Sequence, residues 1–216
     1  MSELLVRSLA GFALILVAIA AAWLGGYVFA VLVALAAVLM FYEWRRLVAG
    51  WGAGWTTAGF LYALMPALAL LWIRERSTLD GHAIGFEMLL WVFIVTWTTD
   101  IGAYFAGRAI GGPKLAPAIS PNKTFAGLIG GMISAGLAGY AWVEFARLSP
   151  TLVWMAPFMA LFAQAGDLFE SWMKRRAGVK DSGTWLPGHG GALDRLDGLV
   201  VVATLTAGAL AAGLLA

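Results

Sequence analysis

Long runs of apolar residues are the feature that most limits how this sequence can fold. Hydrophobic residues make up 62% of the 216 residues and charged residues only 12%, whereas roughly a quarter of the residues in a soluble domain are charged. A helix needs about 20 mostly apolar residues to cross the hydrocarbon layer of a membrane. We therefore expect an all-α fold, a polytopic transmembrane helical bundle with about seven spans. The expected spans are residues 8–24, 26–41, 56–73, 86–105, 128–145, 151–169 and 198–216.

The first apolar run is followed at once by a second one. A cation followed by an apolar run is also typical of a secretory signal peptide, and Arg7 stands before the first run. Because the next run begins directly at Gly26, we expect two membrane helices here and no cleaved leader. Pro66 interrupts the third run and favours a broken or tilted helix.

The cations are distributed unevenly between the two sides that alternating spans create. Of the 14 Lys and Arg residues, only Arg74, Arg76 and Arg147 fall opposite the N-terminus. The positive-inside rule therefore places the N-terminus and the polar loops 106–127 and 170–197 in the cytoplasm. These assignments predict a multi-pass protein of the cell (inner) membrane whose site faces the cytoplasm. We expect residues 1–80 to be a membrane scaffold and residues 81–216 to be the catalytic membrane domain.

The composition argues against several other classes of protein. Cysteine is absent, which rules out disulfides and thiolate metal sites. The only histidines are His82 and His189, too few for a His-rich zinc site. A formal net charge of +2 gives no support for nucleic-acid binding.

Two acids stand at the ends of apolar runs, where a charge is costly unless it reaches water or a partner. Asp100 shares a helical face with Arg108, and Asp167 shares another with Ser171 and Lys174. The structural alternative is that both acids simply reach water at the cytoplasmic ends of their spans. Ionisable residues within membrane spans are functional candidates by default, so we predict a functional role for both.

The first polar loop offers cations and hydroxyl groups to an anion. Arg108, Lys114 and Lys123 supply the charges, and Ser120 and Thr124 supply the hydroxyls. Two structural alternatives stay open. Thr124 could cap the helix that follows, and a basic loop could bind lipid head groups and nothing more.

The second polar loop combines many acids with many cations. Asp194 and Asp197 can point from one face of a helix, although acids at a helix N-terminus also have a purely structural explanation. Oxygen ligands without cysteine favour a hard cation such as Mg²⁺. Carboxylates for a metal and cations for phosphate are what phosphoryl or nucleotidyl transfer requires. The acids in or beside this loop are Asp167, Glu170, Asp181, Asp194 and Asp197.

Within the second loop the sequence resembles a known family. The run from Ser171 to Asp197, S-x-x-K-R-x-x-G-x-K-D-S-G-x-x-x-P-G-H-G-G-x-x-D-R-x-D, is similar to the signature of the phosphatidate cytidylyltransferase family, also called CDP-diacylglycerol synthase. The segments QAGDLFES, AYFAGR and SPNKT resemble other recurring segments of that family. The resemblance covers about residues 95–200. Ala126 departs from it, because many members carry Glu at this position.

This resemblance implies a reaction and a set of site residues. Members join CTP to phosphatidic acid, giving CDP-diacylglycerol and pyrophosphate in phospholipid biosynthesis. On this basis we assign catalysis to Asp167, Lys174, Asp194 and Asp197, with the three aspartates binding one or two Mg²⁺ ions. Asp100 would complete the polar pocket. Asp181 would be a weaker candidate for Mg²⁺. The residues expected to bind the substrates are Arg108, Ser120, Lys123, Thr124, Ser171, Arg175, Lys180, Asp181, Gly188, His189, Gly190, Gly191 and Arg195.

Several alternatives remain at this stage. His189 could contact phosphate or only stabilise its turn. The lipid could be another one, as in a polyprenol kinase or an archaeol cytidylyltransferase, and a transporter or a pure scaffold is a further alternative. The resemblance implies a homodimer, and the small residues of 127–139 would suit close helix packing either within one subunit or between two.

Overall fold

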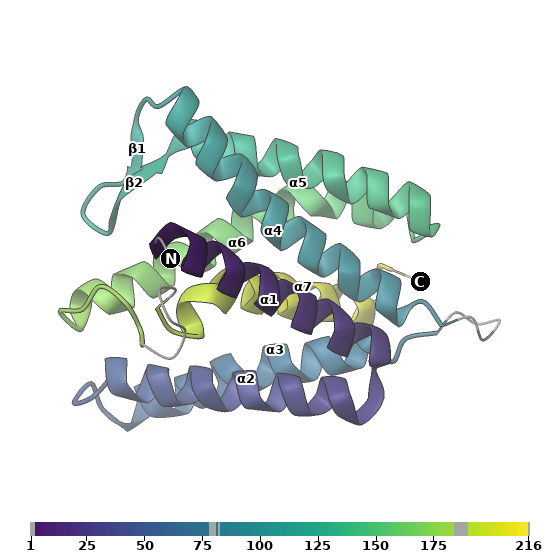
Figure 1. Cartoon of the computed structure of the whole chain (residues 1–216), viewed down its shortest axis with the longest axis horizontal. Coiled ribbons are helices and arrows are strands. Elements are labelled where there is room, and N and C mark those ends of the chain that lie inside the picture. The colour runs from purple at the N-terminus through teal and green to yellow at the C-terminus, as the bar shows by residue number, and fades with distance from the viewer. Residues whose placement is uncertain (1–2, 78–80, 82, 184–189, 216) are drawn as a thin grey trace.

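A computed structural model describes residues 3–77, 81, 83–183 and 190–215 of the chain. In this part of the chain, seven long helices run between the two ends of a bundle, and a short hairpin stands at one end (Figure 1). The expected all-α helical bundle is therefore confirmed. The elements are α1 (Glu3–Leu24), α2 (Gly26–Leu47), α3 (Ala53–Arg74), α4 (Gly85–Ala109), β1 (Lys114–Ala116), β2 (Ser120–Thr124), α5 (Phe125–Ala146), α6 (Thr151–Arg176) and α7 (Leu193–Ala211).

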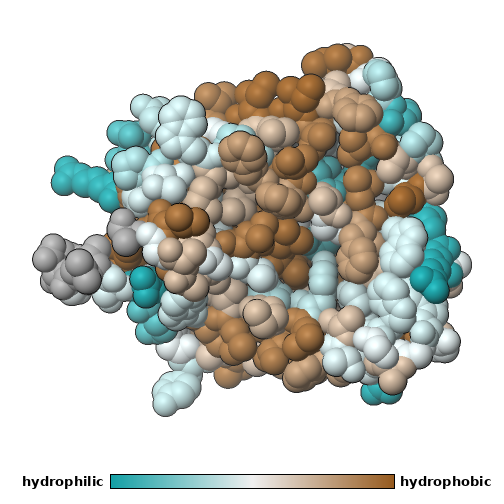
Figure 2. Space-filling view, turned by 180° about the vertical axis from the view of Figure 1, so that it is seen from behind, coloured by the Kyte–Doolittle hydropathy of each residue, from teal (hydrophilic) through white to brown (hydrophobic). Residues whose placement is uncertain are grey.

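The surface of the bundle has the character of a membrane protein. Five helices, α2 to α6, are each long and apolar enough to cross a membrane, judged by length and composition over the described residues. α1 has a shorter apolar stretch, Gly11–Leu24, and α7 carries Asp194 and Asp197 near its start. Figure 2 shows apolar side chains across the middle of one face and polar side chains at both ends. The number of spans and the cytoplasmic N-terminus stay predictions.

Most helices continue beyond the apolar runs that predict them. The apolar pattern ends the sixth span at residue 169, but α6 continues to Arg176, and α7 begins at Leu193 instead of residue 198. Charged side chains such as Glu, Lys and Arg favour helices, so the backbone stays helical where the apolar run stops. The segment 170–197 is therefore not one loop, because its two ends are helical. α3 likewise runs through Pro66 without a break.

A small β-hairpin replaces most of the first predicted loop. β1 and β2 pair antiparallel, with Lys114 opposite Thr124 and Ala116 opposite Ser120. The backbone N–H of Phe125 donates to the carbonyl of Pro113 at 3.1 Å and closes the base of the hairpin. Strands this short and polar have no clear apolar alternation, so the sequence pattern does not predict them.

Small residues let α4 and α5 pack against each other. A Cβ atom at Gly102 would collide with Ser134 of α5, and one at Gly131 would lie 2.9 Å from the carbonyl oxygen of Thr99. Small residues at such contacts allow two helix backbones to come close together. The small-residue stretch 127–139 thus packs within the chain, chiefly on α4 and, at Gly136 and Gly139, on α6.

The polar elements gather at one end of the bundle, which we call the hairpin end. The hairpin, the C-terminal end of α6 and the start of α1 all lie at the left in Figure 1, whereas α7 ends on the opposite side of the bundle. The connection between α2 and α3 lies at the hairpin end too. Residues from distant parts of the sequence can therefore meet there.

Candidate active site

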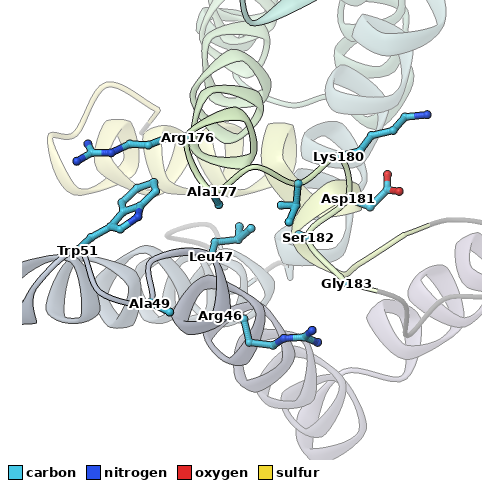
Figure 3. Close-up of a pocket in the computed structure, with 11 residues that line it drawn as sticks. Arg46, Leu47, Ala49, Trp51, Arg176, Ala177, Lys180, Asp181, Ser182 and Gly183 are labelled. Carbon is cyan, nitrogen blue, oxygen red and sulfur yellow. The ribbon is translucent and has the colours of Figure 1, made fainter.

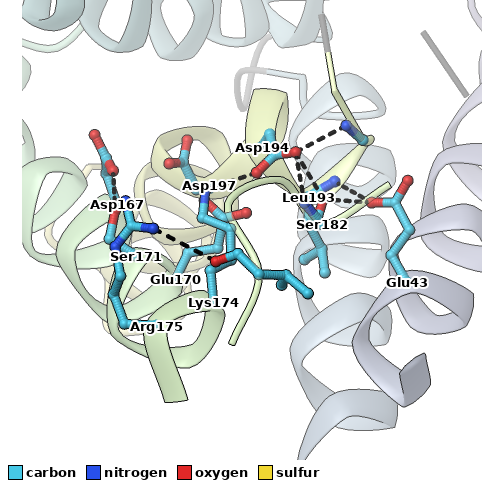
Figure 4. Close-up of polar contacts among 12 residues, drawn as sticks. Glu43, Asp167, Glu170, Ser171, Lys174, Arg175, Ser182, Leu193, Asp194 and Asp197 are labelled. Carbon is cyan, nitrogen blue, oxygen red and sulfur yellow. Dashed lines mark hydrogen bonds and ion pairs between the residues drawn. The ribbon is translucent and has the colours of Figure 1, made fainter. Parts of the chain in front are cut away.

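Three carboxylates from two helices face one another near the hairpin end (Figure 4). Asp167 and Glu170 lie about one turn apart on α6, and Asp197 lies on α7. One oxygen atom of each lies within 4.8 Å of the other two. The two helices can come this close because Gly166 has no side chain: a Cβ atom there would lie 2.9 Å from the carbonyl oxygen of Asp197. We call Asp167, Glu170 and Asp197 the acid cluster.

The acid cluster has the chemistry of a site for a hard cation. Glu170 is 2% exposed, and its Oε1 atom is buried without a hydrogen-bond partner among the described residues. Three carboxylates this close repel one another unless cations or protons balance their charge. Oxygen ligands alone favour Mg²⁺ over softer metals. The residues present therefore fit a magnesium ion, which the unpaired oxygen of Glu170 would help to bind.

Two lysines already balance part of this charge. The Nζ atom of Lys123, on β2, lies 2.6 Å from Oδ2 of Asp167. The Nζ atom of Lys174 lies 3.3 Å from Oε2 of Glu170 and 2.6 Å from Oδ1 of Asp194. Both lysines are mostly buried, with side-chain exposures of 17% and 12%. Their charges are held at fixed positions beside the acid cluster, which suits them to a phosphate bound there.

Asp194 has a different environment from the acid cluster. Its Oδ2 atom accepts hydrogen bonds from the backbone N–H of Ser182 at 2.9 Å and of Gly191 at 2.8 Å, and from the Ser182 hydroxyl at 2.9 Å. Its Oδ1 atom accepts from Lys174. Both oxygens are thus occupied by the protein itself. The predicted metal ligands were Asp167, Asp194 and Asp197, and the structure brings Glu170, instead of Asp194, together with the other two.

Glu43 is a buried carboxylate that the sequence argument did not select. It is completely buried and lies on α2, far from the other residues in sequence. Its two carboxylate oxygens accept from the backbone N–H groups of Ala192 and Leu193 at 2.9 and 2.8 Å (Figure 4). These bonds satisfy N–H groups at the start of α7. The Ser182 hydroxyl lies 2.9 Å from both Glu43 and Asp194, and its single proton serves one of the two carboxylates at a time. One signal was available, because Glu43 is an acid that stands two residues after the apolar run 26–41.

Asp100 and Gln164 extend the polar contacts toward α4. Asp100 is exposed, and its Oδ1 atom accepts a long hydrogen bond, 3.5 Å, from the side-chain amide of Gln164. The backbone carbonyl of Gln164 in turn accepts from Lys123 at 3.4 Å. Asp100 is thus connected to the acid cluster only indirectly, through Gln164 and Lys123.

The remaining candidates of the first polar loop differ in their roles. Thr124 caps α5, because its hydroxyl accepts from the backbone N–H of Gly127 at 3.0 Å. Thr124 thus has the structural role considered above, that of a helix cap. Its side chain is 4% exposed, and its hydroxyl already accepts a hydrogen bond. Arg108 is exposed and donates to the Tyr104 hydroxyl at 3.0 Å. Ser120 opens β2 and is partly buried.

Candidates at the end of α6 either brace the site or line a cavity. The Ser171 hydroxyl donates to Asp167 at 3.3 Å, and Arg175 donates to the carbonyl of Ile119 at 3.3 Å, which ties α6 to the hairpin. Lys180 and Asp181 line a cavity of about 530 Å³ (Figure 3). Its other lining residues include Arg46, Arg176 and Ser182, so the cavity adjoins the bonds that hold Asp194.

The remaining predicted site residues come later in the sequence than the residues that line this cavity. Gly190 has a φ of +80°, a conformation that favours glycine, and a Cβ atom there would lie 2.6 Å from Asp194 Oδ2. Gly191 donates its N–H to the same oxygen. Arg195 is exposed on the first turn of α7. Gly188 and His189 lie outside the described residues.

Comparisons with known proteins agree with the resemblance that the motifs carry. A model of the cytidylyltransferase family matches residues 51–212. A phosphatidate cytidylyltransferase of Brucella suis is 48% identical over 178 residues, which cover 81% of this chain and 62% of the relative. Proteins of the same name from Haemophilus influenzae and Staphylococcus saprophyticus are 43% and 41% identical, over 63% and 65% of this chain and 50% and 55% of their own lengths. The chain thus spans between half and two thirds of the length of these relatives.

Proposed function

The chain belongs to the cytidylyltransferase family, and from this premise we propose that it is a phosphatidate cytidylyltransferase that converts CTP and phosphatidic acid into CDP-diacylglycerol and pyrophosphate. The names of the relatives support this substrate pair over other lipids. The structural observation that carries the proposal is the acid cluster with Lys123 and Lys174 on its two sides.

The chemistry of this reaction matches what these residues can do. A phosphate oxygen of phosphatidic acid attacks the α-phosphorus of CTP, a new P–O bond forms, and the bond to the β-phosphate breaks to release pyrophosphate. A phosphate monoester is mostly dianionic at neutral pH, so the attack needs no strong base. The difficulty is to bring two polyanions together and to stabilise the leaving pyrophosphate. Fixed cations serve both purposes.

The geometry suggests a distribution of roles among the residues. Asp167, Glu170 and Asp197 would hold Mg²⁺, which supplies charge neutralisation for the phosphates. Lys123 and Lys174 would contact phosphate oxygens, and Asp194 would position Lys174. The cavity lined by Lys180 and its neighbours offers a place for the nucleotide. Thr124 would keep its role as the cap of α5, and Gly191 would hold Asp194 through its N–H. The other candidate residues keep the predicted substrate role: Arg108, Ser120, Ser171, Arg175, Asp181, Gly190 and Arg195.

The cellular setting belongs to the same proposal. The apolar helices embed the protein in the membrane that also holds the acyl chains of phosphatidic acid, whereas CTP is a cytosolic substrate. We therefore place the hairpin end at the cytoplasmic face of the inner membrane, as the distribution of cations predicts. A homodimer remains a prediction of the family resemblance, and the mass of the protein in lipid nanodiscs would test it.

Purified protein in lipid vesicles is expected to transfer label from α-labelled CTP to phosphatidic acid, and only when Mg²⁺ is present. γ-Labelled CTP should leave its label in pyrophosphate and none in lipid, because the bond that breaks lies between the α- and β-phosphates. Thin-layer separation of the lipids measures both. Lipid labelled from γ-labelled CTP would indicate a kinase and would exclude cytidylyl transfer.

Replacing Lys123 with alanine is expected to raise the KM for CTP or phosphatidic acid and to lower turnover by about 10- to 100-fold. Half-saturation by Mg²⁺ should shift to lower concentration, because Asp167 loses the cation that lies 2.6 Å from it. Lys114→Ala is the matched control, since Lys114 is an exposed lysine on the partner strand of the same hairpin. Equal kinetics of the two variants would show that Lys123 has no special role.

A further inference from the structure

An apolar groove of about 370 Å³ lies between α3 and α7. Its walls are mainly aliphatic side chains, among them Leu61 and Met65 of α3 and Val201 and Leu205 of α7. Leu61 and Met65 are each 50% exposed. The hydroxyl of Thr204, which also lines the groove, donates to the carbonyl of Val200 at 2.7 Å, so it offers its proton to the helix and not to the groove.

The groove begins about one helical turn from the acid cluster. Val201 follows Asp197 by four residues on α7, so both lie on the same face of the helix. Val201 also packs against α6 beside Asp167, because a Cβ atom at Gly166 would lie 2.7 Å from its Cγ2 atom. The carboxylates and the aliphatic groove are therefore consecutive parts of one surface.

Tyr62 stands where the carboxylates and the groove meet. It lines the groove, and its ring packs against Phe169, which lies between Asp167 and Glu170 in sequence, with ring centroids 6.1 Å apart. Its hydroxyl is buried and has no hydrogen-bond partner among the described residues. Tyrosine suits a boundary between an apolar and a polar environment, because its ring packs while its hydroxyl bonds.

The distance from the acid cluster to the far end of the groove is close to the depth of one membrane leaflet. From Asp197 to Leu205 the axis of α7 advances about 12 Å, at a rise of about 1.5 Å per residue. Half of the hydrocarbon layer measures about 15 Å. A molecule with its phosphate at the acid cluster would therefore have its apolar part in the groove and within the leaflet nearer to the hairpin end.

We propose that this groove binds one acyl chain of the lipid substrate and so directs the lipid phosphate to the acid cluster. The inference rests on the proposed function and adds the place of the lipid. Lipid tails are about as apolar as the groove, so the groove contributes orientation more than attraction. A packed helix is a poorer occupant, because membrane helices meet through small residues, whereas Leu61 and Met65 are large and Met is adaptable.

Photolabelling tests the place of the lipid without requiring turnover. The probes are phosphatidic acid and phosphatidylcholine, each with a diazirine in the same acyl chain, added to reconstituted protein with Mg²⁺. We expect phosphatidic acid to label peptides that contain residues 58–66 and 200–205 several times more strongly than phosphatidylcholine does. Equal labelling by both lipids, or preferential labelling elsewhere, would overturn the proposal.

Kinetics test the same groove by filling it. Leu61→Trp and Met65→Trp should raise the KM for long-chain phosphatidic acid by about tenfold and leave the KM for CTP and the rate with dihexanoyl phosphatidic acid nearly unchanged. Leu68→Trp is the matched control, since Leu68 is 53% exposed on the same helix and does not line the groove. Two tryptophan variants are used so that the test can still be made if one of them does not fold.

The two experiments separate the inference from the proposed function. Wild-type protein that labels no lipid from CTP would count against the proposed function, and photolabelling would still decide about the groove. Normal kinetics of both tryptophan variants, together with equal photolabelling, would reject the groove and leave the proposed function intact.

Discussion

Asp197→Asn is expected to abolish most cytidylyl transfer, with a loss of about a thousandfold in kcat. Asp197 supplies one of the three carboxylates of the acid cluster, and an amide keeps the shape of the side chain while it removes the charge that a hard cation requires. Glu170→Gln should behave similarly, because Glu170 has an unpaired buried oxygen at the same place. Turnover of α-labelled CTP in vesicles measures both losses.

Thermal unfolding separates metal binding from damage to the fold. The carboxylates of the acid cluster repel one another, so Asp197→Asn without metal should be at least as stable as the wild type. Mg²⁺ should raise the Tm of the wild type, because a ligand that binds only the folded state stabilises it, and this increase should disappear in the variant. The control is Glu144→Gln, an exposed acid on α5. A folded Asp197→Asn protein with full Mg²⁺-dependent turnover would contradict the assignment.

The sequence predicts the helical bundle well because apolar length is a direct physical requirement for crossing a membrane. It predicts the helix ends poorly, since hydrophobicity marks where lipid begins and not where the backbone leaves the helix. α6 continues for seven residues past the predicted end at 169. Those residues include Glu170 and Lys174, which the structure therefore fixes on a helix and not in a loop.

The site is predictable only where its residues belong to one spaced motif. Asp167, Asp197, Lys123 and Lys174 could all be selected from sequence, and the structure brings them to one place. Asp194 illustrates the limit, because a carboxylate in the first turn of a helix can accept hydrogen bonds from backbone N–H groups as readily as it can bind a metal, and spacing does not separate the two roles. Contacts between distant segments, such as that of Glu43 with α7, follow only from the packing of α2 against the second half of the chain.

Removing the Glu43 carboxylate is expected to have the second large effect. In Glu43→Ala the backbone N–H groups of Ala192 and Leu193 lose their acceptor in a buried place. The loss should lower the free energy of unfolding by about 2–4 kcal/mol. Asp194 and Asp197 lie on the same first turns of α7, so a shift of this helix start should also reduce kcat by about 100-fold. Thermal unfolding and the vesicle assay measure the two effects, with Glu144→Ala as the exposed control.

Glu43→Gln distinguishes a charge effect from a geometric one. Both carboxylate oxygens of Glu43 accept hydrogen bonds, one from the backbone N–H of Ala192 and the other from the backbone N–H of Leu193. A glutamine has only one oxygen, so in either orientation its NH₂ group faces a donor. The variant should therefore resemble Glu43→Ala, with faster hydrogen exchange at residues 191–193 and a kcat that falls more than the KM rises. Wild-type exchange and turnover in Glu43→Gln would mean that Glu43 does not position the start of α7.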